Sequence, residues 1–103
     1  MPAQLTEAQN GHWLLTLSGP LTIYEVAEVK TTLKALPPTP DQLSIHLADV
    51  DEIDTAGLQL LLVLQKWLGE QLHLIHHSEA VIELLDLFQL APLFGDEIVL
   101  PQH

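Results

Sequence analysis

The chain lacks both cysteine and arginine, and each absence excludes a class of site. Without cysteine among its 103 residues, it can build no disulfide framework, no thiolate nucleophile and no cysteine-ligated zinc site. Without arginine, it has no bidentate clamp for phosphate or carboxylate groups. Its fixed cations are Lys30, Lys34 and Lys66, against 14 acidic residues, which gives a net charge of −11. A surface this acidic repels nucleic acid and anionic lipid, so we expect neither as a direct ligand.

Long apolar runs and a leader-like segment are also missing. The longest apolar run of the central helical stretch, Leu60 to Leu64, is far too short to span a bilayer. Residues 1–4 show neither the basic start nor the apolar run of a signal peptide. Apolar residues still make up 48% of the chain, too many for a disordered protein. We therefore expect one cytoplasmic domain over residues 1–103, with no direct membrane insertion.

Strand and helix signals alternate along the chain. Asn10-Gly11 is a hairpin turn signal, and Thr22 with Glu25 has the form of a helix-capping box. Such alternation predicts an α/β fold, in which right-handed crossovers join parallel strands of one mixed sheet. The predicted strands are 4–9, 12–18, 43–47, 71–76 and 97–100, and the predicted helices start after Thr22, near Thr55 and after Ser78.

The turn from Asp54 to Gly57 is the feature around which the chain is organised. It joins a predicted strand to a helix expected from about Thr55 to Trp67, so Asp54 is well placed as the helix N-cap. Thr55 then lies in the first turn, by the positive end of the helix dipole, where a phosphate would meet favourable N–H groups. An ordinary capped helix would show the same two residues, so this pattern leaves both interpretations open.

The helix after this turn is apolar on two sides. At about 100° per residue, its apolar residues form two stripes on roughly opposite faces. A small domain with helices on one sheet can hardly bury both stripes, so we expect one to meet a partner. One stripe holds Leu58, Leu61, Leu62 and Leu68; the other holds Leu60, Val63 and Trp67, beside Gln59 and Lys66.

Potential metal and catalytic residues follow no known motif. Four acids lie close together, at positions 49, 51, 52 and 54. A calcium loop would need an oxygen ligand where this chain has Ile53, followed by a glycine, and both are missing. This favours a solvated loop with an N-cap. Four histidines, at 46, 73, 76 and 77, would come near one another if the third and fourth strands pair, but no zinc-binding spacing is present. Nucleophile-elbow, phosphate-loop and dinucleotide motifs are missing too. We expect no enzyme, no metal and no cofactor.

Several segments together resemble the STAS domain family, the fold of bacterial anti-sigma factor antagonists. The central match is the strand followed by Asp-Thr-Ala-Gly-Leu and a helix, at residues 54–58. Residues 18–21, 47–50 and 84–90 look like the family's second strand end, third strand and third helix. The resemblance implies a single mixed β-sheet with helices packed mainly on one face.

The resemblance also implies a function. It predicts a non-catalytic regulatory module that binds a protein partner, with the start of the second helix as the switch that a partner kinase phosphorylates. Residues 21–24, 54–59, 77–78 and 94–96 are similar to small members associated with bacterial chemotaxis gene groups, which points to chemosensory or related signalling. Similar short members serve as cytoplasmic subunits of a phospholipid-transporting ABC assembly, so binding to its ATPase is the alternative. The partner is therefore a kinase-like, sensory or ATPase protein, and the oligomeric state stays open.

The resemblance places the first leucine stripe in the core and leaves the second facing outward. We expect the partner-binding residues to be Asp54, Thr55, Ala56, Gly57, Gln59, Leu60, Val63 and Trp67. Burial of the second stripe in the core is the alternative.

Two departures from the family pattern matter. The antagonists carry the phosphorylated serine directly before the glycine, whereas this chain has Ala56 there. Any regulatory phosphorylation is thus expected on Thr55 and not on Ser18, Ser44 or Ser78; an unmodified Thr55 within the interface is the alternative. Many members also continue into a fourth helix, whereas this sequence ends at His103, which predicts a shortened C-terminus with a bare edge or an added partner.

Overall fold

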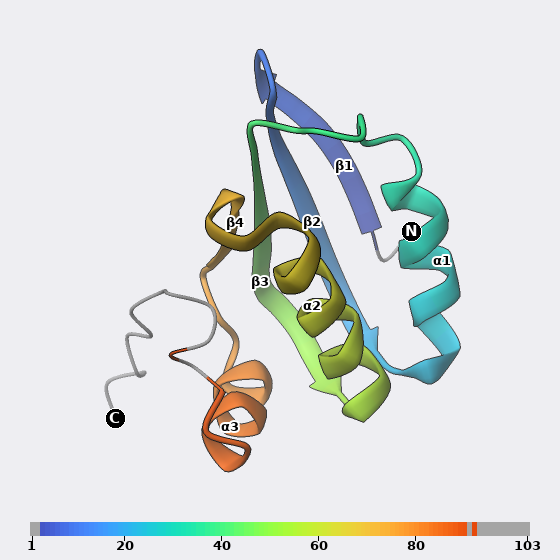
Figure 1. Cartoon of the computed structure of the whole chain (residues 1–103). Coiled ribbons are helices and arrows are strands. Elements are labelled where there is room, and N and C mark those ends of the chain that lie inside the picture. The colour runs from blue at the N-terminus through green and yellow to red at the C-terminus, as the bar shows by residue number, and fades with distance from the viewer. Residues whose placement is uncertain (1–2, 91, 93–103) are drawn as a thin grey trace.

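A computed structural model describes residues 3–90 and 92 of the chain. These residues form four strands, three α-helices and a short 3-10 helix (Figure 1). In chain order the elements are β1 (Ala3–Gln9), β2 (His12–Leu21), α1 (Ile23–Leu33), β3 (Gln42–Ile53), α2 (Thr55–Leu68), η1 (Gly69–Gln71), β4 (Leu72–Ile75) and α3 (Glu79–Leu87).

The strands form one mixed sheet in the order β1-β2-β3-β4. β1 and β2 are an antiparallel hairpin that turns at Asn10-Gly11, where Gly11 has φ +76°, the backbone region that the predicted turn requires. β2 pairs parallel with β3, and β3 pairs parallel with β4, each through a crossover that contains a helix. The mixed α/β sheet that the sequence predicts is therefore confirmed.

The helices pack on one face of the sheet, as expected from the family resemblance. Figure 1 shows α2 crossing in front of the sheet, with α1 beside it and α3 near the lower ends of the strands. Strand side chains that face the helices are buried, whereas their neighbours on the opposite face, such as Thr16, Ser44 and His46, are only partly buried. The buried core side includes Leu15, Leu17, Leu43, Ile45, Leu47, Leu72 and Leu74 from the sheet and Leu58, Leu61, Val81 and Leu85 from the helices.

Local capping signals fix where the helices begin. Glu25 accepts a hydrogen bond from the backbone N–H of Thr22 at 3.2 Å, and the Thr22 hydroxyl also donates to this carboxylate. The Ser78 hydroxyl oxygen accepts from the N–H of Val81 at 3.3 Å at the start of α3. These contacts satisfy N–H groups that the first turn of a helix leaves unpaired. Among the residues that the structure describes, no helix is both long and apolar enough to cross a membrane.

The third strand differs from the sequence prediction. We expected it to end at Leu47, with the following acids in a solvated loop, but β3 continues to Ile53. Two register shifts in the β2–β3 pairing absorb extra residues and keep the strands together up to Leu21 and Ile53. Asp49, Asp51 and Glu52 are accordingly exposed strand residues. The predicted strand 97–100 and the expected shortened C-terminus lie outside the described residues.

Candidate functional site

Two strand-to-helix junctions lie side by side at one edge of the sheet. β2 leads into α1 through Thr22, and β3 leads into α2 through Asp54. Because β2 and β3 are parallel and Leu21 pairs with Ile53, both helices start at the same edge. The N–H of Asp54 also donates to the carbonyl of Leu21 at 3.4 Å, which ties the second junction to the end of β2.

The Asp54 carboxylate joins the two helix N-termini. Its Oδ1 accepts a hydrogen bond from the N–H of Gly57 at 3.1 Å, which confirms the predicted N-cap of α2. Its Oδ2 accepts a second bond from the N–H of Ile23, the first residue of α1, also at 3.1 Å. The Gly57 N–H holds the pKa of Asp54 below its ordinary value; partial burial opposes this shift, and the Ile23 N–H adds to it. One ionised side chain thus fixes α1 relative to α2.

Gly57 is a position where the chain leaves no room for a side chain. It lies in the first turn of α2 and is buried. A Cβ atom there would overlap the backbone carbonyl oxygen of Leu21 and lie 3.0 Å from both the Ile53 Cγ1 and the Leu21 Cγ atoms. The glycine therefore permits α2 to approach the end of β2, which is the approach that places Asp54 within reach of α1.

Thr55 follows Asp54 as the first residue of α2, and its side chain is exposed. Ala56, directly before Gly57, is partly buried and lines a groove between α1 and α2. The exposed hydroxyl of this turn is therefore that of Thr55, next to Asp54.

The groove has a volume of about 410 Å³ and runs between the two helices. Exposed apolar side chains lie on both helices. Ile23 on α1 (66% exposed) and Val63 on α2 (62%) line the groove, whereas Tyr24 on α1 (88%) and Trp67 on α2 (48%) are exposed outside its lining. We call these four residues, with the exposed Gln59, the α1/α2 face. Its groove is lined by Ile23, Val26, Ala27, Lys30, Ala56, Gln59, Leu60 and Val63.

The contribution of α1 to this face was not predicted from the sequence. Ile23 and Tyr24 are not among the partner-binding residues that the sequence predicts, whereas Val26, Val29 and Leu33, at helical spacing, pack in or against the core. A signal was nevertheless present: Tyr24 lies about 140–200° around the helix from each of those three residues, on the side that should be polar. A large aromatic residue on that side indicates an interaction surface.

The predicted exposure of Leu60 is wrong. Its side chain is only 4% exposed and belongs to the core cluster, while it also lines the floor of the groove. The reason is that α1 packs against α2 and covers part of the second stripe. Leu62, expected in the core, is only partly buried. Val63, Trp67 and Gln59 are exposed as predicted.

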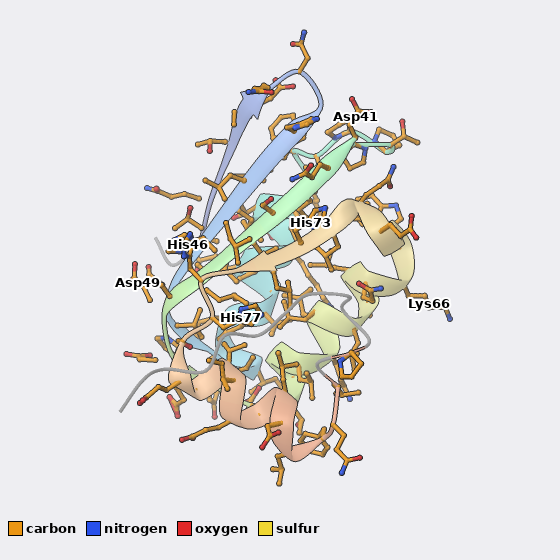
Figure 2. The ribbon with its side chains drawn as sticks, turned by 90° about the vertical axis from the view of Figure 1, so that its left-hand side faces the viewer. Asp41, His46, Asp49, Lys66, His73 and His77 are labelled. Carbon is orange, nitrogen blue, oxygen red and sulfur yellow. The ribbon has the colours of Figure 1, made fainter. Side chains whose placement is uncertain are left out.

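The histidines do not form a metal centre within the described part of the chain. β3 and β4 pair, and the rings of His46 and His76 lie 4.8 Å apart. No group of three or more histidine or acidic residues among residues 3–90 and 92 could hold a metal ion together. Figure 2 shows His46 and Asp49 on one side of the sheet, with Lys66 on the other.

Comparisons with known proteins agree with this architecture. A family model described as "Mlab, STAS domain" matches residues 5–99. The structure of the anti-sigma factor antagonist SpoIIAA in its unphosphorylated form is similar to this chain, with a TM-score of 0.64 and 15% sequence identity over 82% of this chain and 81% of that one. No curated protein matches the sequence.

Proposed function

Because the chain belongs to the STAS domain family, we propose that it is a non-catalytic regulatory module of the anti-sigma factor antagonist type, which acts by binding a protein partner. The observation that carries this proposal is the α1/α2 face. Four large apolar side chains are exposed on the two helices that form one groove, two of them in its lining, next to the junction that the family resemblance marks as the switch. Exposed apolar groups gathered around a groove are typical of a protein-binding surface.

We place the regulatory position of this module at Thr55. A phosphate at the start of α2 would accept backbone N–H bonds and complement the helix dipole, each charge-assisted contact contributing about 1.5–3 kcal/mol. The ionised Asp54 opposes it by like-charge repulsion, and the chain has no arginine to offset that repulsion. The second form of the proposal is therefore an unmodified Thr55 whose hydroxyl contacts the partner directly.

Phosphopeptide mass spectrometry on protein from native cells, with binding assays on two variants, tests this position. Modification on Thr55, with Thr55→Ala and Thr55→Glu differing in partner affinity, supports the switch. Weakened binding by both variants without modification supports the contact role. A phosphosite on Ser18, Ser44 or Ser78, or wild-type binding by both variants, would contradict a functional role for this turn.

The cellular setting that we propose is cytoplasmic, in chemosensory or related signalling, with a kinase-like or sensory partner. One observation favours the second setting, in which the chain is a subunit bound to the ATPase of a phospholipid-transporting ABC assembly. Ala56 removes the hydroxyl at the family's usual switch position, as a permanently bound subunit would permit. Affinity purification from native cells separates the two settings, because it recovers either a signalling protein or an ABC ATPase.

A further inference from the structure

The lysines of this acidic chain all lie on the two helices that form the α1/α2 face. Lys30 lines the groove itself. Lys34, the C-cap of α1, follows the groove residue Ala27 by seven positions. Lys66 follows the groove residue Gln59 by seven positions on α2. Residues seven apart share one side of a helix, so both lysines continue the groove walls toward the helix C-termini. All three side chains are exposed, and Figure 2 shows Lys66 projecting away from the sheet.

The two ends of the groove therefore carry opposite charge. Both helices begin at the junction held by Asp54, so their C-terminal halves, with Lys30, Lys34 and Lys66, lie together at the other end. The helix dipole favours a cation near a helix C-terminus, but this alone does not account for the placement. The last turn of α3 carries no basic residue, whereas both groove-forming helices carry one on the groove side.

We propose that the groove binds an amphipathic helix of the partner protein, whose apolar side fills the groove and whose acidic residues contact Lys30, Lys34 and Lys66. This inference rests on the proposed function and adds the chemistry of the partner. The groove lining spans residues 23–30 of α1 and 56–63 of α2, so the groove is about 12 Å long, which fits about two turns of a bound helix. Apolar side chains at helical spacing would contact Val63 and Ala27 over the buried Leu60.

The charges around the groove determine which partner helix binds and in which direction that helix lies. A basic helix would bring its cations against the fixed cations of this chain, at a cost that like-charge contacts impose at an interface. An acidic helix would be repelled over the rest of a surface with net charge −11, so the lysine end of this groove is where it can be accommodated. Reversing the bound helix would place its acids beside Asp54, so one orientation is preferred.

The test uses the full chain and the partner that it contacts in native cells. The photo-reactive residue p-benzoylphenylalanine replaces Val63, which is exposed enough to tolerate it. The full-length protein that cross-links there is then purified, and its affinity is measured for wild type and for Lys30→Gln/Lys66→Gln. The control is Gln4→Glu/Gln9→Glu, two exposed positions of β1, which changes the net charge by the same −2.

We expect Kd to rise about two- to fivefold for each lysine removed, the range of exposed ion pairs, and the control to bind like wild type. A zero-length carbodiimide cross-linker should join the amines of Lys30, Lys34 or Lys66 to acidic residues of one partner segment. Unchanged or tighter binding by the lysine variant would overturn the inference, as would cross-links from this chain's carboxylates to lysines of the partner at the groove. The proposed function survives that result, because a protein still cross-links at position 63; the absence of any such cross-link would contradict the proposed function itself.

Discussion

Replacing Gly57 with alanine tests the close approach of α2 to the end of β2. Alanine normally stabilises a helix relative to glycine by about 1 kcal/mol, so helix propensity alone predicts a higher free energy of unfolding for the variant. The structure predicts a lower free energy of unfolding, because the added methyl group would overlap the Leu21 carbonyl oxygen and press on Ile53. The two effects have opposite sign, and the measured direction decides between them.

The size of the loss follows from the atoms involved. Overpacking typically costs about 1–3 kcal/mol, and the upper part of this range applies because the nearest atom belongs to the backbone and cannot rotate away. After subtracting the gain in helix propensity, we expect the free energy of unfolding to fall by about 2 kcal/mol. For a domain near 100 residues this corresponds to a drop in Tm of about 8–16 °C.

Urea unfolding followed by circular dichroism measures this change. Gly19→Ala is the control, since a Cβ there meets no atom within 4 Å and the cost comes from its φ of +76° alone. A Gly57→Ala variant with a raised unfolding midpoint would refute the close contact between α2 and β2.

Two further substitutions test the core and the Asp54 bridge. Leu60→Ala should lower the free energy of unfolding by about 2–4 kcal/mol, because it leaves a cavity at a side chain that is only 4% exposed. Val63→Ala, at an exposed position nearby, should change the free energy of unfolding by less than about 0.5 kcal/mol. Equal small effects of the two substitutions in urea unfolding would contradict the burial of Leu60. Asp54→Asn should destabilise the protein near neutral pH. Since the folded-state pKa of Asp54 lies below its ordinary value of 3.8, the stability that it contributes is present above that value and is lost as the pH falls toward the lower pKa. The wild-type and variant unfolding curves should therefore converge in acid, and a gap that stays constant down to pH 3 would contradict this role.

Local signals predicted the elements of the fold well. The Asn10-Gly11 turn and the caps at Thr22, Asp54 and Ser78 each depend on residues within four positions, so the sequence contains all the information needed. The start of α2 at Thr55 was predicted to the residue, and its end to within one.

Features that depend on pairing between distant segments were not predictable in the same way. The length of β3 was underestimated, because its acids resemble a turn unless the bulged pairing with β2 is known. The burial of Leu60 was not predicted, because the spacing of apolar residues along α2 reveals two apolar stripes but does not reveal which of them α1 covers. The bond from Ile23 to Asp54 spans 31 residues and follows from the pairing of Leu21 with Ile53. The groove arises from these long-range contacts.

A matched pair of surface variants tests most directly whether the α1/α2 face is the partner-binding site. Val63→Asp and Leu87→Asp each replace an exposed aliphatic side chain, 62% and 73% exposed, with one carboxylate, but they lie on α2 and α3 respectively. Partner recovery from native cells is measured for both, after circular dichroism shows that both fold. We predict that Val63→Asp loses the partner and that Leu87→Asp retains it. Retention by Val63→Asp, or loss by Leu87→Asp alone, would contradict the assignment.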